Sequence, residues 1–206
     1  MTGELWDWDD DPEELLAVLR RGGVLGIPTE SSYGLGADPS DARGMAAIFE
    51  AKGRAAEQAL PVVVADLEQA AALGVERDAP GLDALAALWP APVSLVVPIA
   101  RPLPASAGGS TLAIRIPDHA RLRTLLRRIG PLTATSANRS GEPPLLDPRA
   151  TSELLGAIDH RVIDDGILPG GAPSTLVRWV GGGFRVVRSG RFPAEGLPSG
   201  APGRDR

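Results

Sequence analysis

Hydrophobic and polar positions along the chain alternate between the short apolar runs of buried strands and the helical period of amphipathic segments. The first helix is predicted to begin at Asp11-Pro12-Glu13-Glu14, where an Asp cap precedes Pro and a Glu follows three positions after the cap. Leu15 and Leu19 then share one face, and Gly22-Gly23 ends the helix. Residues 24–27 form an apolar run that predicts a buried strand.

The same pattern predicts alternating helices and strands over most of the chain. Further helices are expected over 41–51, 66–74, 82–88, 117–129 and 147–155. Further strands are expected over 61–65, 93–97, 111–116, 132–135, 162–163, 174–180 and 184–187, with a glycine turn between the last two. This alternation predicts an α/β fold, and the closing hairpin makes its β-sheet a mixed one. Residues 28–36 are predicted to be a loop.

Length and composition place one domain in the middle of the chain. With 206 residues, the chain fits one large domain or two small ones, and a single domain over 12–192 is the prediction. Residues 1–11 form an acidic N-terminal segment, and 193–206, rich in Pro, Gly, Ser and charge, are predicted to be a disordered tail. No stretch approaches the ~18 apolar residues of a membrane span. Because the start is acidic and lacks the pattern of a secretory signal, we expect a soluble, cytoplasmic protein with no membrane association.

The residue content excludes several kinds of site. The chain has no Cys, so a disulfide framework, a thiolate zinc site and cysteine catalysis are excluded. Its two histidines, His119 and His160, are too few and too far apart in sequence for a histidine metal cage. We therefore predict no metal site built from protein ligands.

Charge is distributed unevenly along the chain, whose net charge is −5. Residues 1–14 hold seven acids and no base, whereas 101–149 hold eight arginines and three acids. An arginine excess of this kind suits an anionic partner such as RNA. It also fits a solvated basic face on the helix predicted over 117–129, and the sequence leaves both interpretations open.

Lys, Asn and Tyr each occur only once in the chain, and this rarity draws attention to their positions. Of the 21 basic residues, 20 are Arg, and Lys52 is the one Lys. Asn138 is the one Asn, and Tyr33 is the one Tyr. In a chain that favours Arg so strongly, a retained Lys indicates a position that requires a compact point charge. Compositional chance and the dipole of the helix before Lys52 are alternative explanations.

Candidate binding residues lie where predicted strands end. Neither common Gly-rich phosphate loop is present, so a bound nucleotide would be held by other loops. Loops at strand ends carry hydroxyl and amide side chains, and α/β proteins place such loops at the ligand-binding edge of the sheet. Each of these side chains also fits a helix cap or a turn. They are Thr29, Ser31, Ser32, Thr135, Ser136, Asn138, Ser140, Ser174 and Thr175.

Arg115 lies within an apolar strand. In the run 111–116, Leu112 and Ile114 share one face, whereas Thr111 and Arg115 share the other. A buried guanidinium is costly unless a carboxylate or phosphate pairs with it. The sequence therefore predicts either a structural acid partner for Arg115 or a role in binding an anionic ligand.

Several short motifs occur in a fixed order along the chain. They are Pro28-Thr29-Glu30-Ser31-Ser32-Tyr33-Gly34-Leu35-Gly36, Lys52-Gly53-Arg54, Ala113-Ile114-Arg115-Ile116-Pro117-Asp118-His119, Ser136-Ala137-Asn138, Pro173-Ser174-Thr175 and Val187-Arg188-Ser189-Gly190. Together they resemble the YrdC-type threonylcarbamoyl-AMP synthases, with their P-T-[DE]-T-x-Y-G-L-G loop and their K-x-R and S-x-N signature. The resemblance covers residues 12–192 and is greatest to the short, single-domain, TsaC-like members.

The resemblance implies both a fold and an activity. The fold is a single α/β domain around a twisted, mixed β-sheet flanked by helices, with a positively lined concave cavity. The activity is that of a nucleotidyltransferase that makes L-threonylcarbamoyladenylate from L-threonine, bicarbonate and ATP and releases pyrophosphate. Threonylcarbamoyl transferase partners would pass the group to adenosine 37 of tRNAs. Mg²⁺ would be carried by the phosphates of ATP.

The resemblance also implies roles for individual residues. ATP would be bound by Lys52, Arg54, Thr111, Asn138 and Arg188, with Lys52 and Arg54 acting on its phosphates as the catalytic residues. Threonine would be bound by Ser31, Arg115, Ser136 and Ser174, with the Arg115 guanidinium holding its carboxylate. Three positions depart from the family pattern: Ser31 replaces a usual Thr, Gln58 a frequent Asn, and Val63 a His found in some members.

Two alternative functions come from the same motifs and charges. One is an RNA-binding module of the YrdC fold that uses the basic segment 101–149 to bind tRNA or ribosomal RNA weakly. With one Tyr, three Phe and four Trp, the chain is poor in the aromatic residues on which such modules stack bases. The other is a carbamoyl-adenylate-forming enzyme, whose known examples are much longer and carry cysteine zinc motifs that this chain lacks.

Overall fold

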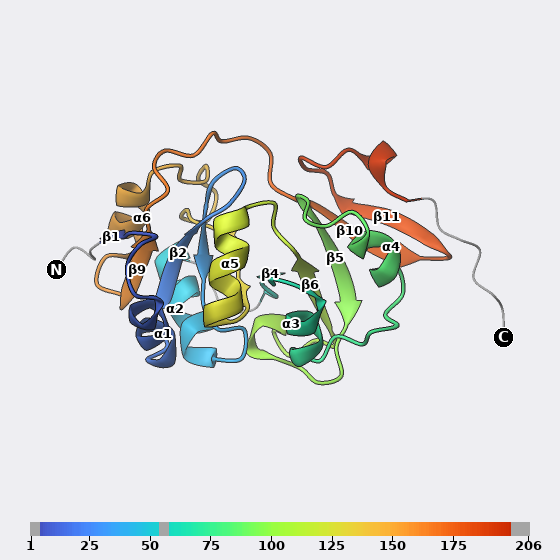
Figure 1. Ribbon diagram of the computed structural model, residues 1–206, viewed down its shortest axis with the longest axis horizontal. Coiled ribbons are helices and arrows are strands. Elements are labelled where there is room, and N and C mark those ends of the chain that lie inside the picture. The colour runs from blue at the N-terminus through green and yellow to red at the C-terminus, as the bar shows by residue number, and fades with distance from the viewer. Residues whose placement is uncertain (1–4, 54–57, 199–206) are drawn as a thin grey trace.

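Two β-sheets and the helices packed on them make up the fold (Figure 1). The computed structural model describes residues 5–53 and 58–198. In spatial order, sheet A consists of β1 (Leu5–Trp6), β9 (His160–Ile163), β2 (Val24–Pro28), β3 (Tyr33–Gly36) and β8 (Thr135–Ser136). Sheet B consists of β11 (Gly183–Arg188), β10 (Thr175–Val180), β5 (Val93–Pro98), β6 (Thr111–Arg115), β4 (Val62–Val63) and β7 (Leu132–Thr133).

Both sheets are mixed. In sheet A, β2 runs parallel to β9 and antiparallel to β3. In sheet B, β5 runs parallel to β10 and antiparallel to β6, and β10 and β11 form the expected closing hairpin. The predicted α/β fold with mixed strand pairing is therefore confirmed. The sequence did not reveal that the strands divide between two sheets.

Six α-helices cover these sheets in the described part of the chain. They are α1 (Pro12–Arg20), α2 (Ala42–Lys52), α3 (Leu67–Ala72), α4 (Leu82–Ala86), α5 (Ala120–Ile129) and α6 (Pro148–Leu155). Asp side chains cap the N-termini of α1, α2, α3 and α6 by accepting backbone N–H bonds. Helix α5 begins at Ala120, later than predicted, because the His119 side chain accepts the Leu122 N–H and serves as its cap.

Helix α5 joins the two sheets. Figure 1 shows it in front of the sheets, between β2 and β4. Its apolar face packs in one buried cluster with α1, with Leu25 of sheet A, and with Val63 and Leu132 of sheet B. A second, larger cluster contains Leu35 of sheet A and Leu95 of sheet B. Burying apolar surface from both sheets in the same clusters fixes the sheets relative to each other.

The chain crosses directly from one sheet to the other at Ala134. Thr133 ends β7 in sheet B, and Thr135 begins β8 in sheet A. The Thr133 Oγ1 accepts the Ala37 N–H at 3.0 Å, and the Thr133 N–H donates to the Ala37 carbonyl at 2.9 Å. This crossing brings strand ends of both sheets to one space, which is where most of the predicted site residues lie.

Elements of secondary structure lie at both ends of the described chain, on either side of the predicted domain 12–192. Residues before 12 belong to the fold, because β1 pairs with β9 and Trp6 is fully buried. At the other end, Ala194–Gly196 forms a 3-10 turn, and Leu197 packs against the larger cluster. The order of the described chain thus extends past the boundary predicted at 193, while residues 199–206 of the predicted tail lie outside the described residues.

Candidate active site

A cavity of about 340 Å³ lies among the strand ends of both sheets. Its walls come from the loop between β2 and β3, residues 58–63, the end of β6, residues 134–136, the segment before β10, and the end of β11. Five of the nine predicted site residues line this one cavity. They are Ser31, Arg115, Ser136, Ser174 and Arg188.

Arg115 ends β6 and forms an ion pair with Glu30. Its Nη1 lies 2.7 Å from both carboxylate oxygens of Glu30, and the Asp118 N–H donates to Glu30 Oε1 at 2.7 Å. The two side chains are only 9% and 12% exposed. Burial alone raises the pKa of Glu30, but the charge and hydrogen bonds of Arg115 outweigh burial and hold that pKa below its ordinary value. The sequence predicted either a structural acid partner for Arg115 or a role in binding an anionic ligand. The structure identifies Glu30 as the acid partner.

Arg188 is the second cation of the cavity. It ends β11, and its Nη2 donates to the Ser174 carbonyl at 3.0 Å. Burial lowers the pKa of Arg188, and the nearby positive charge of Arg115 lowers it further. Two guanidinium groups thus face one cavity, and the carboxylate of Glu30 compensates only one of them. This electrostatic arrangement favours an anionic ligand.

Lys52 and Asn138 support the loop that presents Ser136. The buried Lys52 Nζ lies 2.6 Å from the Ser136 carbonyl oxygen, and 3.1 and 3.2 Å from the carbonyl oxygen and Oδ1 of Asn138. The Asn138 amide donates to the carbonyls of Arg139 and Glu142, and its Oδ1 accepts the Ser136 hydroxyl at 2.5 Å. Neither Lys52 nor Asn138 lines the cavity itself. Both lie one layer behind its wall.

The two remaining serines lie in connecting segments that line the cavity: Ser31 between β2 and β3, and Ser174 directly before β10. Ser31 lies in a turn that closes through Thr29, whose Oγ1 donates to the Ser32 carbonyl at 2.7 Å. The Ser174 Oγ lies 3.2 Å from the Oγ of Ser94, which is almost fully buried. Ser31 and Ser174 thus line the same cavity as Arg115 and Arg188.

Thr111 and Arg54 are not brought to this cavity by the described structure. Thr111 begins β6, is exposed, and pairs with Pro98, whereas Arg115 ends the same strand. A strand rises about 3.3 Å per residue, so the length of β6 separates their Cα atoms. Arg54 lies outside the described residues. The predicted ATP-binding roles of both residues stay predictions.

Sequence reasoning missed two residues that organise the site. Glu30 lies within the quoted Pro28–Gly36 motif, and a buried Arg in need of a carboxylate was the signal that could have found it. Arg191 Nη1 donates to the Glu30 carbonyl at 2.9 Å and to the Gly170 carbonyl at 3.3 Å. It lies just after the motif that contains Arg188, and nothing local distinguished it from the other arginines.

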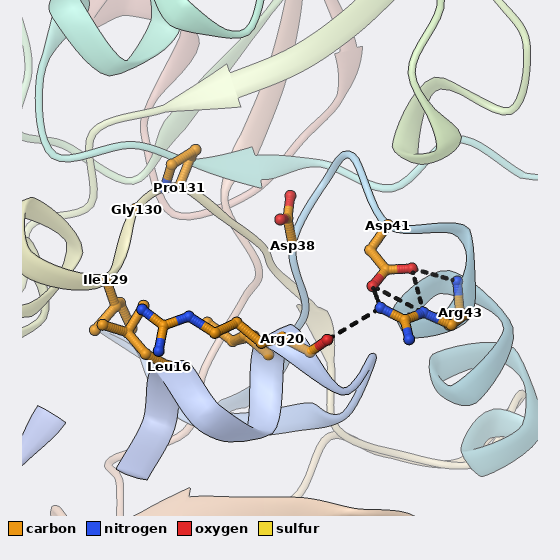
Figure 2. Close-up of a pocket in the computed structure, with 9 residues that line it drawn as sticks. Leu16, Arg20, Asp38, Asp41, Arg43, Ile129, Gly130 and Pro131 are labelled. Atoms are coloured by element: carbon orange, nitrogen blue, oxygen red, sulfur yellow. Dashed lines mark hydrogen bonds and ion pairs between the residues drawn. The ribbon is translucent and has the colours of Figure 1, made fainter. Parts of the chain in front are cut away.

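A larger cavity of about 470 Å³ lies away from all predicted site residues (Figure 2). The figure shows the Arg43 guanidinium turned toward Asp41, with which it pairs at 2.7 Å, and toward the Arg20 carbonyl. The lining of this cavity includes the Arg43–Asp41 pair, further charged residues and apolar residues such as Leu16. The smaller cavity is the better candidate site because its lining combines Arg115 and Arg188 with the predicted Ser31, Ser136 and Ser174, whereas aspartates accompany the two arginines of the larger cavity.

Neither a metal cluster nor a membrane helix occurs in the described parts of the chain. Residues 5–53 and 58–198 contain no group of three or more His, Cys, Asp or Glu that could hold a metal ion. Over the same residues, no helix is both long and apolar enough to cross a membrane.

Comparison with known proteins places this chain in one family. The Sua5/YciO/YrdC family, described as "Telomere recombination", matches residues 17–190. A protein of Thiobacillus denitrificans named threonylcarbamoyl-AMP synthase is 38% identical over 167 residues, which cover 79% of this chain and 88% of that protein.

Solved structures agree with this assignment. A variant of P. abyssi Sua5 matches with a TM-score of 0.81 and 29% identity over 94% of this chain and 62% of its own. P. abyssi Sua5 complexed with L-threonine matches with a TM-score of 0.77 and 30% identity over 89% of this chain. This chain spans only 55% of the length of that second structure.

The fold thus defines an α/β protein of the YrdC type, and two arginines line the cavity among the strand ends of its two mixed sheets. The chain belongs to the Sua5/YciO/YrdC family. The family resemblance seen in the sequence motifs is confirmed.

Proposed function

We propose that this chain is a threonylcarbamoyl-AMP synthase, a nucleotidyltransferase that uses L-threonine, bicarbonate and ATP. One observation carries the proposal: Arg115 and Arg188 face one cavity together with Ser31, Ser136 and Ser174. Two cations beside several hydroxyls suit a ligand that carries carboxylate and phosphate groups. The relatives named threonylcarbamoyl-AMP synthase and the Sua5 structure titled as a threonine complex support the same activity.

The proposed chemistry has two steps. The threonine amine attacks the bicarbonate carbon, and loss of water leaves the carbamate of threonine. A carbamate oxygen then attacks the α-phosphorus of ATP, and the bond from that phosphorus to the bridging oxygen breaks. Pyrophosphate leaves, and threonylcarbamoyladenylate remains. Neither step needs a covalent bond to the protein, so catalysis rests on positioning and on charge stabilisation.

We propose a division of the cavity between the two substrates. Arg115 binds the threonine carboxylate, and Ser31, Ser136 and Ser174 orient the rest of the amino acid. Arg188 binds ATP from the cavity. On the family resemblance, Lys52, Arg54, Thr111 and Asn138 bind ATP as well, with Lys52 and Arg54 acting on its phosphates. Because Lys52 lies behind the loop that carries Ser136 and bonds its carbonyl, we propose that Lys52 also holds this loop in place.

The adenylate itself is the most direct test. Purified protein is incubated with Mg²⁺-ATP, bicarbonate and L-threonine, and the products are separated and identified by mass. We expect threonylcarbamoyladenylate and pyrophosphate in equal amounts, and both should depend on threonine and bicarbonate. Equal pyrophosphate release with and without threonine would contradict the assignment of threonine as substrate.

The roles of Mg²⁺ and partner proteins and the cellular location are also proposed from the family resemblance. Mg²⁺ accompanies ATP as part of that substrate, and tRNA-modifying transferase partners consume the adenylate. A cytoplasmic location is part of the same proposal. The alternative of RNA binding through 101–149 stays a prediction, and Arg121, Arg123 and Arg127 of that segment each lie 3.7 Å from an Asp of this chain. Carbamoyl-adenylate formation likewise stays a prediction.

A further inference from the structure

We infer that Glu30 is a positioning residue that presents one side of the Arg115 guanidinium to a substrate carboxylate. The inference rests on the proposed function and deepens it by naming the group that orients the threonine-binding cation. Glu30 itself does not line the cavity, whereas Arg115 does. A substrate therefore meets Arg115 while Glu30 stays behind it.

The ion pair uses only part of the guanidinium. Both Glu30 carboxylate oxygens lie 2.7 Å from the same atom, Arg115 Nη1. Within residues 5–53 and 58–198, no hydrogen bond engages Nε or Nη2 of Arg115. A guanidinium has five N–H donors in a rigid planar arrangement, so fixing Nη1 also fixes the direction of the others. The N–H groups on Nε and Nη2, which Glu30 does not contact, are therefore available to a second carboxylate.

Glu30 is held from three separate parts of the chain. Its side chain accepts from Arg115 at the end of β6 and from the N–H of Asp118 in the following turn. Its carbonyl accepts from Arg191, just after β11. The end of β6, the segment that follows it and the segment after β11 therefore converge on one residue of the β2–β3 loop. A carboxylate with such support defines the position of its partner more narrowly than an exposed ion pair does.

The charge of Glu30 also affects which ligand the cavity favours. Arg115 and Arg188 are close enough for the charge of one to lower the pKa of the other. Glu30 offsets part of this repulsion and permits both guanidiniums to face the same space. Glutamine in its place would keep the size of the side chain but would lose the charge and one of the two acceptors that Nη1 contacts.

Kinetics of Glu30→Gln provide the first arm of the test. We expect the KM for threonine to rise about tenfold or more, with kcat at saturating threonine within about threefold of the wild type. The Kd for ATP measured without threonine should stay within about twofold. Glu30→Asp keeps the charge and should recover part of the threonine affinity. A matching loss for ATP and threonine in both variants, with a lowered Tm, would overturn the inference, because Glu30 would then only support the fold.

The second arm does not depend on turnover. Phenylglyoxal modifies accessible guanidinium groups, and mapping of modified peptides by mass measures the rate at each arginine. We expect Arg115 to react about tenfold faster in Glu30→Gln than in the wild type, since its main partner is weakened. An unchanged Arg115 rate would overturn the positioning role. A wild-type protein that forms no adenylate but shows the faster Arg115 reaction in the variant would contradict the proposed function and support the positioning of Arg115.

Asp159→Asn is a matched control for both arms. It removes a carboxylate from an ion pair with the same shortest distance, 2.7 Å to Arg21, on the exposed surface. Neither of these residues lines the candidate site. We expect unchanged KM for both substrates and an unchanged Arg115 rate. If the control shifted the threonine KM as Glu30→Gln does, a general charge effect would replace the specific role of Glu30.

Discussion

The ammonium of Lys52 lies 3.1 Å from the carbonyl oxygen of Asn138 and 3.2 Å from its Oδ1, although 86 residues separate the two in the chain. The one Lys and the one Asn of the protein are thus direct partners. Together they hold the loop that places Ser136 in the cavity wall. The proposed site is therefore built in two layers, with substrate-facing groups in front and this pair behind them.

Lys52→Arg is expected to reduce activity although the charge is kept. The ammonium fits among three oxygens at 2.6–3.2 Å in a buried position, and a planar, larger guanidinium cannot reproduce these bonds there. We expect kcat/KM to fall about tenfold or more, measured with saturating bicarbonate. Arg20→Lys, in an exposed pair with Glu13, is the control and should be neutral. An unchanged kcat/KM for Lys52→Arg would show that any cation suffices.

Arg115→Ala should separate threonine binding from ATP binding. Loss of the guanidinium should weaken threonine binding by about 2–5 kcal/mol, read from its KM. ATP binding without threonine should change much less, whereas Lys52→Ala and Arg54→Ala should weaken ATP first. Similar losses for both substrates in a folded Arg115→Ala protein would show that our division of the cavity is wrong.

The double variant Glu30→Gln with Arg115→Ala tests the structural side of the same pair. Arg115→Ala alone leaves the buried Glu30 carboxylate without its cation, which lowers the free energy of unfolding. Adding Glu30→Gln removes the uncompensated charge, so part of the stability should return while threonine affinity does not. Chemical denaturation of the four proteins in this cycle measures the coupling. Strictly additive losses would mean that the pair does not stabilise the fold.

We expect the ionisation of Tyr33 to lower the free energy of unfolding at high pH. Its hydroxyl donates to the Gly166 carbonyl at 3.0 Å and accepts the Asp165 N–H at 3.1 Å. Burial raises its pKa to about 12 from the ordinary 10.0, and nearby aspartates add to the rise. Because the folded pKa is the higher one, this stabilisation is complete below pH 10 and is lost as the pH rises from 10 toward 12.

The titration can be followed directly because Tyr33 is the only Tyr. Phenolate absorbance should show a midpoint near 12 in the folded protein, against 10.0 after unfolding in denaturant. Tyr33→Phe should flatten the pH dependence of the free energy of unfolding over that interval. A folded protein whose phenol titrates near its ordinary value would contradict the burial and bonding described for this side chain.

Gly190→Ala should disturb the cavity through the backbone. A Cβ at this position would overlap the Pro173 carbonyl oxygen and lie 2.6 Å from the backbone N of Thr175. The close approach allows the Arg191 N–H to bond Pro173 at 2.8 Å. We expect a loss of about 1–3 kcal/mol in unfolding free energy together with weaker substrate binding. Gly183→Ala, at the start of β11 where a Cβ meets nothing within 4 Å, is the control.

Local signals in the sequence predicted most elements of the fold but not their pairing. Asp caps and apolar runs marked helices such as α1 and strands such as β2, because these signals lie within a few residues of the element. Strand β3 was predicted to be a loop, since Tyr33–Gly36 contains two glycines and only pairing with β2 and β8 makes it a strand. Likewise, β1 forms because Leu5 and Trp6 pair with β9 and the Trp6 side chain is buried there.

The sequence by itself determined the family and the chemical types in the site: a single Lys, a buried Arg, hydroxyls at strand ends and an Asn. Only the tertiary structure decided which of these face the cavity and which stand behind it. Arg115 and Glu30 are 85 residues apart, and Lys52 reaches its oxygens across 84 and 86 residues. Burial of apolar surface packs the two sheets together and so brings these residues close. An unpaired buried charge is costly, so the charged groups then form bonds with the partners within reach. No pattern within one element of the chain contains that information.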